Sequence, residues 1–272
     1  MIHHLLSGLD SYHGQIEVII RDVGHGNWNE IRFGNTRIIY DIGAQKEWPA
    51  NRIQSIIDAA KFKKNEEIYI FISHWDVDHY HAILKLNKSQ LKQVKGFFAP
   101  TLRNPRTQTM NRVLERLNDA GISVSTIPFS IKKNKGRKIE LQLAYGGNRL
   151  KVFRSTKTTS TNLNSIVLSL VTNSKSVLMT GDQNYEKLHD FVISSKPPTM
   201  PMIMVMPHHG GFAGNLDTKK WGIIHLDEII ISYHDSNSYG HPLAINRTRA
   251  ETLLVTKPVL YTNGTGNKTF NI

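Results

Sequence analysis

The sequence has no cysteine among its 272 residues. Disulfide bonds and thiolate ligands are therefore excluded, and a bound metal would need imidazole, carboxylate, amide or water ligands. No apolar run approaches the roughly 20 residues that cross a bilayer. The stretch Met1–Leu6 has no basic segment followed by a long apolar core. We therefore expect no signal peptide, no membrane contact and a cytoplasmic location.

Several common catalytic patterns are missing as well. There is no glycine-rich loop ending in Gly-Lys-Ser/Thr, no recognisable Ser-His-Asp arrangement and, without cysteine, no thiol nucleophile. The size of the chain is ample, because a protein of this length buries roughly 75% of its unfolded surface. We expect one domain that spans residues 1–272.

Positive charge is in excess. The chain has 34 Lys and Arg residues against 22 Asp and Glu residues, a formal net charge of +12. Such a surplus favours a polyanionic partner, with a basic surface that only aids solubility as the alternative. A basic loop spans residues 131–138, and Lys151, Arg154 and Lys157 follow it. The candidate contacts to a phosphate backbone in this loop are Lys132, Lys133, Lys135, Arg137 and Lys138.

Four side chains that can bind metal lie within six positions, directly after an apolar run. Residues 68–72 consist of aromatic and β-branched side chains, which predicts a buried strand. The stretch His74-x-Asp76-x-Asp78-His79 follows it. Two carboxylates are costly to bury together unless a cation lies between them. The pattern predicts metal ligands at a strand end, with an ordinary polar turn as the alternative.

A second apolar strand also ends in imidazoles. Residues 202–206 are followed by Pro207, His208 and His209. We expect one of the two histidines to bind metal and the other to line or support the site. The position directly after the strand end favours His208 as the ligand.

These patterns resemble the metallo-β-lactamase-fold hydrolase superfamily, and within it the metallo-β-lactamase-like domain of ComEC-type DNA internalisation competence proteins. The superfamily signature is His-x-His-x-Asp-His, and Asp76 stands here in place of the second His. The resemblance implies an α/β protein, an αβ/βα four-layer sandwich of two mixed β-sheets flanked by helices. It covers residues 16–272 and is weakest over residues 98–162.

Further motifs resemble the same domain and imply residues that support the site. The stretch Asp22-Val-Gly-His-Gly-Asn is similar to the opening Asp-Val-Gly-Gln-Gly-Asp, although a plain hairpin turn is the alternative. Asp41-Ile-Gly is similar to the Asp-x-Gly whose acid supports the metal site from behind. Many superfamily members have a ligand His before a strand that corresponds to residues 162–170. Here Asn162 and Asn164 occupy that neighbourhood.

Two motifs in the second half resemble catalytic elements of the domain. Thr-Gly-Asp182 is similar to the element whose carboxylate bridges two metals. Asn237-x-Tyr239-Gly-His241-Pro is similar to the last catalytic motif, which implies substrate contacts for Asn237 and Tyr239. His241 would then protonate a leaving oxygen or hold a phosphate. A capping histidine at a helix that begins near Leu243 is the alternative.

The patterns and the resemblance together imply a centre for two divalent metal ions. We expect Mn²⁺ or Zn²⁺, with Mg²⁺ also compatible with the oxygen ligands. Such a pair would activate a water and stabilise the charge of a displacement. The expected catalytic residues are Asp78, Asp182 and His241. The expected metal ligands are His74, Asp76, Asp78, His79, Asp182, His208 and His209.

The predicted function is therefore a metal-dependent phosphodiesterase or nuclease that acts on nucleic acid, DNA above all. One alternative is a small-molecule hydrolase, such as a cyclic nucleotide phosphodiesterase or a lactone or thioester hydrolase. Another is a nucleic-acid-binding module with an impaired site, which the missing ligand His would explain. Binding to nucleic acid would weaken steeply with salt, whereas turnover of a small substrate would not.

Overall fold

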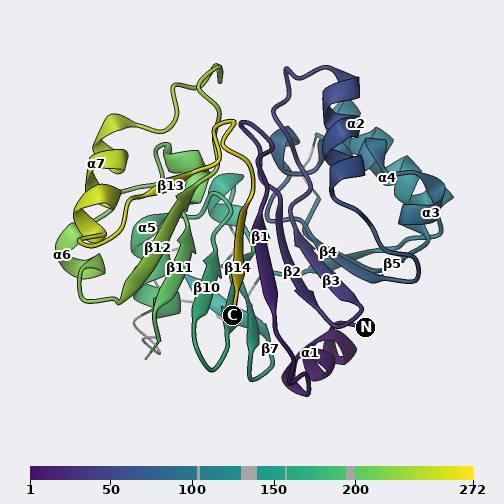
Figure 1. Cartoon of the computed structure of the whole chain (residues 1–272). Helices are drawn as coiled ribbons and strands as arrows, with labels where there is room; N and C mark the ends of the chain where they lie inside the picture. The colour runs from purple at the N-terminus through teal and green to yellow at the C-terminus, as the bar shows by residue number, and fades with distance from the viewer. Residues whose placement is uncertain (103–104, 130–139, 157, 194–199) are drawn as a thin grey trace.

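The computed structural model describes residues 1–102, 105–129, 140–156, 158–193 and 200–272. Within these residues two seven-stranded sheets face each other, and helices lie on the outer side of each sheet (Figure 1). The first sheet has the order β14 (Lys268–Asn271), β1 (Glu17–Ile20), β2 (Asn29–Phe33), β3 (Thr36–Tyr40), β4 (Glu67–Phe71), β5 (Val94–Pro100) and β6 (Val124–Ile127).

The second sheet begins at its edge with a short strand from late in the chain. Its order is β13 (Leu260–Tyr261), β12 (Leu226–Ile231), β11 (Met202–Val205), β10 (Ser176–Met179), β9 (Val167–Val171), β8 (Leu150–Ser155) and β7 (Leu141–Gly146). Both sheets are mixed. Strands β3 to β6 and strands β10 to β13 are parallel, whereas β14-β1-β2-β3 and β7-β8-β9-β10 pair antiparallel.

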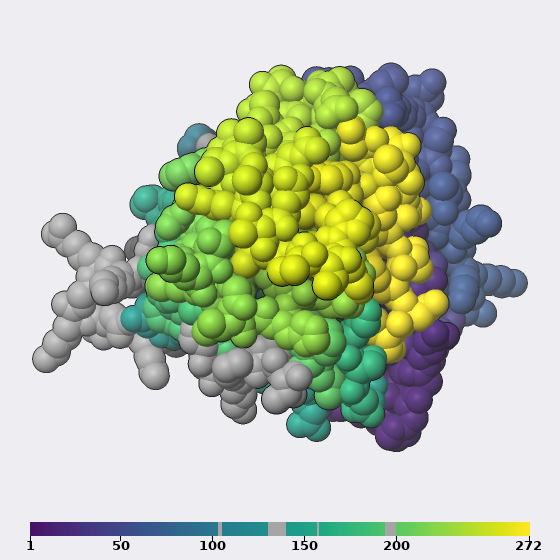
Figure 2. All heavy atoms as spheres, turned by 60° about the vertical axis from the view of Figure 1, so that its left-hand side comes forward, coloured from purple at the N-terminus to yellow at the C-terminus, as the bar shows by residue number. Residues whose placement is uncertain are grey.

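The helices divide between the two sheets. Those beside the first sheet are α2 (Ala50–Ala59), α3 (Lys88–Leu91) and α4 (Gln108–Asp119). Those beside the second are α5 (Tyr185–Lys187), α6 (Thr218–Trp221) and α7 (Ala244–Leu253), and Figure 2 shows the face that α6 and α7 cover. Helix α1 (Ile2–Asp10) contacts β8. Single turns are η1 (Val77–His79), η2 (His81–Lys85), η3 (Asn162–Asn164), η4 (Leu188–Ile193) and η5 (Pro207–Gly210).

Alternation of side chains along the strands produces three apolar layers. In β3, Ile38 faces the core between the sheets and Ile39 faces the core beneath the helices. In β10, Val177 faces the shared core and Leu178 faces the other helical layer. Strands buried on both faces are typical of parallel sheets covered by helices. The predicted four-layer sandwich is therefore confirmed.

A buried network of charges joins the outer face of the first sheet to the end of α2. The Glu30 carboxylate is fully buried and pairs with Arg21, Arg32 and Arg37. The Arg37 guanidinium also binds Glu66 at 3.0 Å and donates to the carbonyl of Ala60, which caps α2, at 3.1 Å. Burial by itself raises the pKa of Glu30, but the arginines, Arg21 first, outweigh it and lower the pKa.

The parallel strands determine where polar residues meet. Strands β3, β4, β10 and β11 each lead into residues that were predicted from the sequence to form the site. Parallel neighbours present their carboxyl ends at one edge of a sheet. Residues 162–164, predicted as the start of a strand, form the turn η3, in which Ser165 N–H donates to the Asn162 carbonyl. None of the described helices is long and apolar enough to cross a bilayer.

Candidate metal centre

Side chains from both sheets converge where these strands end. The first group consists of His74, His79 and Asp182, which are all buried and offer ligand atoms within 4.8 Å of one another. Nε2 of His79 lies 3.3 Å from Asp182 Oδ1, and Nε2 of His74 lies 3.5 Å from Asp182 Oδ2. Two neighbours adjoin this group. His208 Nε2 is 3.5 Å from Asp182 Oδ2, and Asp76 Oδ2 is 3.5 Å from His74 Nε2.

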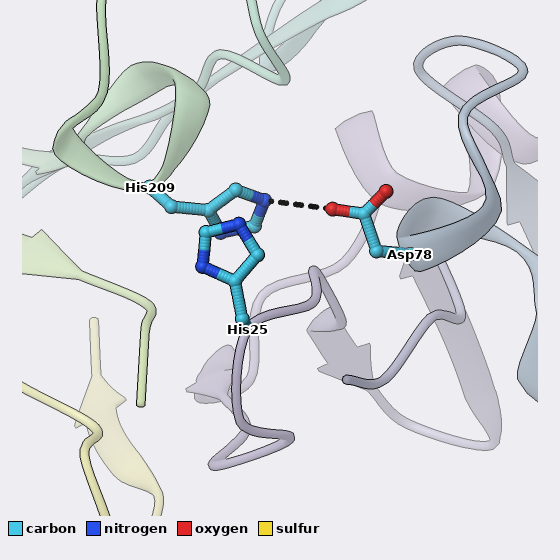
Figure 3. A group of neighbouring side chains, drawn as sticks. All are labelled: His25, Asp78 and His209. Carbon is cyan, nitrogen blue, oxygen red and sulfur yellow. Dashed lines mark ion pairs between the residues drawn. The ribbon is translucent and has the colours of Figure 1, made fainter. Parts of the chain in front are cut away.

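A second group lies beside the first and consists of His25, Asp78 and His209 (Figure 3). His209 Nε2 is 3.4 Å from Asp78 Oδ2, the pair that the dashed line joins. The imidazole of His25 packs against that of His209 with 4.3 Å between ring centroids. The sequence favoured His208 over His209 as a ligand, and in the structure both imidazoles reach a carboxylate of the centre.

In His208 and His209 the protein holds the far ring nitrogen, which aims the other nitrogen at the centre. Nδ1 of His209 donates to the Ser232 carbonyl at 2.7 Å, and Nδ1 of His208 donates to the Phe212 carbonyl at 3.0 Å. A carbonyl oxygen can only accept, so Nε2 of each neutral ring carries the free lone pair. Such outer partners orient metal-binding histidines in proteins.

Asp41 supports the centre from behind, the position that the resemblance implied for it. Its carboxylate is buried and lies 2.8 Å from Nδ1 of His79. It also accepts from the backbone N–H and hydroxyl of Ser73, at 2.6 and 2.8 Å, and from the amide of Asn27 at 2.7 Å. Gly43 explains the rest of the Asp-x-Gly motif, because a Cβ there would lie 1.6 Å from the carbonyl oxygen of Asp78.

Electrostatics in the centre favour positive charge. Burial by itself lowers the pKa of His79, but nearby carboxylates, Asp182 and Asp41 first, outweigh it and raise the pKa well above its usual value. Burial raises the pKa of Asp182, but the His74 and His79 imidazoles outweigh burial and hold it well below its usual value. A divalent cation would supply the same charge and displace the proton.

Four of the atoms that could bind a cation are buried without a hydrogen-bond partner among the described residues. They are the Nε2 atoms of His74, His79 and His209 and Oδ1 of Asp182. A buried polar atom left without a partner costs about 1–3 kcal/mol. Divalent cations would satisfy all four atoms, so the residues present fit a metal centre.

His241 borders both groups. Its imidazole lies 4.8 Å from that of His208 and 5.2 Å from that of His25, measured between ring centroids. The side chain of Asn237 clamps this loop, since its amide donates to the His241 carbonyl at 2.7 Å and its oxygen accepts from the N–H groups of His241 and Tyr239. Burial, with His208 and His209 next to the ring, lowers the pKa of His241 to about 4.

Several predicted site residues lie elsewhere. Asp22 accepts from Gly266 N–H at 3.0 Å, so it joins the end of β1 to the turn before β14 and belongs to neither group. The Asn164 side chain accepts from Arg154 at 2.5 Å, and Asn162 contributes its carbonyl to η3. Arg154 is fully buried, so it does not present a cation to a phosphate backbone. The predicted basic contacts Lys132, Lys133, Lys135, Arg137 and Lys138 lie outside the described residues.

His25 is the residue that the sequence argument missed. It lies in the turn Gly24-His25-Gly26 after β1, and nothing nearby in sequence marks it as a ligand. Its neighbours in the centre come from η1 and from the end of β11, far along the chain. A histidine between two glycines at a strand end was the available signal.

A cavity of about 420 Å³ is lined by Trp75, which lies between His74 and Asp76 in the sequence, and by Asn164. None of the residues of the two groups is among the described residues that line it. The remaining wall is rich in hydroxyl groups and consists of Thr101, Leu102, Pro105, Phe129, Thr158, Thr159, Ser160 and Thr161.

Comparison with protein-family models and with curated proteins finds no match to this chain. Solved structures do match. The metallo-β-lactamase fold protein YhfI from Bacillus subtilis is 10% identical, with a TM-score of 0.55, over 95% of this chain and 100% of YhfI. Igni18, a metallo hydrolase from Ignicoccus hospitalis, is 13% identical, with a TM-score of 0.52, over 94% of this chain and 99% of Igni18.

A third match extends the same fold to different chemistry. CmlA, a diiron β-hydroxylase from Streptomyces venezuelae, is 12% identical, with a TM-score of 0.53, over 96% of this chain and 55% of CmlA. Likenesses at such low identity establish architecture and leave activity open. With two mixed sheets flanked by helices and these structural neighbours, the chain has the metallo-β-lactamase fold.

Proposed function

We propose that the protein is a metal-dependent phosphodiesterase that hydrolyses nucleic acid, DNA above all, at a centre for two divalent cations. The pair of adjacent ligand groups carries this proposal. Asp182 turns one carboxylate oxygen to His79 and the other to His74. His79 in turn lies 5.4 Å from His209 of the second group, between ring centroids. Cations held in the two groups would be close enough to act on one substrate group.

Some residues of the centre would bind the cations, and others would position the substrate. His74, His79 and Asp182 would hold one cation, and Asp78 with His209 would hold the other. When bound, such a pair lowers the pKa of a water and neutralises charge on the phosphate. The mixture of imidazole and carboxylate suits Mn²⁺ or Zn²⁺, with Mg²⁺ compatible with the carboxylates.

His241 would act on the leaving oxygen as a hydrogen-bond donor. Because the pKa of His241 is lowered to about 4, its ring is neutral at pH 7, and nearby cations would keep it neutral. A neutral imidazole still offers one N–H to an oxygen that gains charge. The clamp by Asn237 fixes the backbone of His241, which favours a defined position of the ring.

The net charge of +12 supports a polyanionic substrate. The cavity of about 420 Å³ lined by Trp75 and Asn164 supports a second candidate function, hydrolysis of a small phosphodiester such as a cyclic nucleotide. Its volume lies within the range of about 300–1,000 Å³ typical of small-molecule sites.

The test compares two kinds of substrate and two variants. Single-stranded DNA, duplex DNA and bis(p-nitrophenyl) phosphate are incubated with the protein and Mn²⁺ or Zn²⁺. We expect Asp78→Ala to lower cleavage by about 100-fold or more, because loss of even an outer partner of a metal ligand costs about 10- to 100-fold. Asp58→Ala, which changes an exposed carboxylate of α2, should behave like wild type.

The outcomes separate the candidates. Cleavage of DNA that Asp78→Ala abolishes supports the nuclease. Turnover of the small diester alone supports the second candidate. DNA binding without cleavage of either substrate, with substoichiometric metal on elemental analysis, would indicate a binding module and refute both.

A further inference from the structure

We infer that His25 is a metal ligand, and that His25, Asp78 and His209 form an outer cation site at the mouth of the centre. The inference rests on the two-cation centre of the proposed function, but not on its substrate. The three residues offer ligand atoms within 4.8 Å of one another and come from three separate segments, the turn after β1, η1 and η5 (Figure 3).

The rings of this group leave nitrogen atoms without a partner in the protein. Among the described residues no hydrogen-bond partner is found for the buried Nε2 of His209 or for the buried Nδ1 of His25. Asp78 Oδ2 lies 3.4 Å from His209 Nε2, so a carboxylate faces the two imidazoles. Two imidazoles and a carboxylate form a ligand set found in protein sites for Zn²⁺ and other transition metals.

Hydrogen bonds within the protein hold the loop that carries His25 without a bound cation. The N–H of His25 donates to the side-chain oxygen of Gln45 at 3.3 Å, and the hydroxyl of Ser232 donates to the Gly26 carbonyl at 2.9 Å. The N–H of Asn27 donates to the Asp78 carbonyl at 3.0 Å. Hydrogen bonds from both sheets therefore hold the loop, and its contact with Asp78 connects two of the ligands directly.

The absence of a side chain at Gly26 allows this loop to pack closely against the backbone of Ala44. A Cβ on Gly26 would lie 2.6 Å from the backbone of Ala44. The His25 ring is also held from the solvent side, because Tyr239 stacks on it with 4.9 Å between centroids and 21° between planes. A ligand held in place in this way loses little entropy when a cation binds.

The two groups differ in burial, and we expect the more buried group to bind its cation with the higher affinity. All three residues of the first group are buried, whereas Asp78 of the outer group is partly exposed, with 17% of its side chain accessible. An exposed ligand exchanges more readily with water. We expect the inner cation to bind first and the outer cation, at His25, to leave first on dialysis.

The experiment titrates metal-free protein with Zn²⁺ by calorimetry and confirms the stoichiometry by elemental analysis. Wild type should bind two ions per chain. His25→Gln should bind the outer ion about tenfold more weakly or worse, with the inner ion unchanged. His234→Gln, which changes a half-buried histidine of the neighbouring loop that belongs to neither group, should match wild type. Two ions bound to a folded His25→Gln with wild-type affinities would overturn the inference.

A second measurement does not depend on whether the variant folds. In wild-type protein labelled with ¹⁵N-histidine, the second equivalent of Zn²⁺ should shift the ring-nitrogen resonances of His25. An unshifted His25 at saturation would also overturn the inference. Neither measurement uses a substrate, so a protein that binds two ions and cleaves no phosphodiester refutes the proposed function and leaves this inference standing.

Discussion

Asp41 shows how much of the centre depends on one residue that is not placed to bind metal. Its carboxylate accepts from Ser73, Asn27 and His79, and it links the end of β3 to the residues that follow β4. Each of these contacts needs an acceptor. A side chain that offers N–H groups in place of an oxygen would turn one of the donors away, and the imidazole of His79 would lose its fixed direction.

The substitution Asp41→Asn tests this role. We expect affinity for the inner cation to fall roughly 10- to 100-fold, as for other residues that orient metal-binding histidines. Calorimetric titration with Zn²⁺ measures it, with Asp58→Asn on the surface of α2 as the matched control. Equal affinities in Asp41→Asn and wild type would show that His79 needs no such support.

Gly43 permits two loops of the centre to touch, and this can be tested by adding one methyl group. In Gly43→Ala the new Cβ would overlap the Asp78 carbonyl, so we expect a loss of about 2 kcal/mol or more in the free energy of unfolding. Gly8→Ala is the control, since Gly8 lies in α1 with nothing within 4 Å of an added Cβ. That control should gain about 0.5–1 kcal/mol, which denaturant unfolding would measure.

The sequence predicts candidate ligands where polar residues follow a strong strand. His74, Asp78 and His209 were singled out because buried apolar runs end beside them, and Asp182 through its resemblance to a known motif. The structure places His74 and Asp182 in the first group and Asp78 and His209 in the second. His25 follows a strand too, but a lone imidazole between glycines is also an ordinary turn. His25 becomes a candidate ligand only in the folded protein, where Asp78 and His209 lie beside it.

The outer face of the first sheet shows what stabilises an element that is not purely apolar. Glu30 in β2 is surrounded by Arg21, which follows β1, by Arg32 in β2 and by Arg37 in β3. All three arginines also donate to the Ala60 carbonyl. The network thereby satisfies the end of α2. Removal of this central carboxylate would leave the buried Arg21 without its counter-charge, and among the described residues Arg37 and Arg32 would keep only Glu66 and Glu17.

Glu30→Gln should therefore lower the free energy of unfolding at pH 7 by about 3 kcal/mol. Because the pKa of folded Glu30 is depressed below its unfolded value near 4.3, its stabilisation is complete above that pH and is lost as pH falls through the folded pKa. The difference between the two proteins should shrink below about pH 4. Urea unfolding across pH measures this, with the exposed Glu115→Gln as control. A difference independent of pH would contradict the argument.

At the element scale, strands buried on both faces were predicted from continuous apolar runs, as for β4 and β11. Strands β6 and β7 were not predicted, because neither contains a continuous apolar run and most of their residues are partly or fully exposed. Both are edge strands, whose pairing depends on a neighbour rather than on a buried pattern. Helix α1 was also missed, although Leu5, Leu6 and Leu9 are buried on one side of it.

At the scale of the whole molecule, the net charge of +12 makes a prediction that separates the two candidate substrates. Binding of labelled single-stranded DNA to metal-free protein, measured by fluorescence anisotropy, should weaken about tenfold or more between 50 and 200 mM salt. The Michaelis constant for bis(p-nitrophenyl) phosphate should change little over the same range. DNA affinity that does not depend on salt would remove the support that charge gives to the nuclease proposal.

The pairing of β14 with β1 has a consequence for how the protein is made. The backbone of Ile16 exchanges hydrogen bonds with Ile272, and β14 completes the first sheet next to one of its earliest strands. A ribosome synthesises β1 long before β14, so one edge of β1 has no hydrogen-bonded neighbour during most of translation. We expect this sheet to be completed only after Asn271 has left the exit tunnel, and until then the open edge of β1 can pair with other chains.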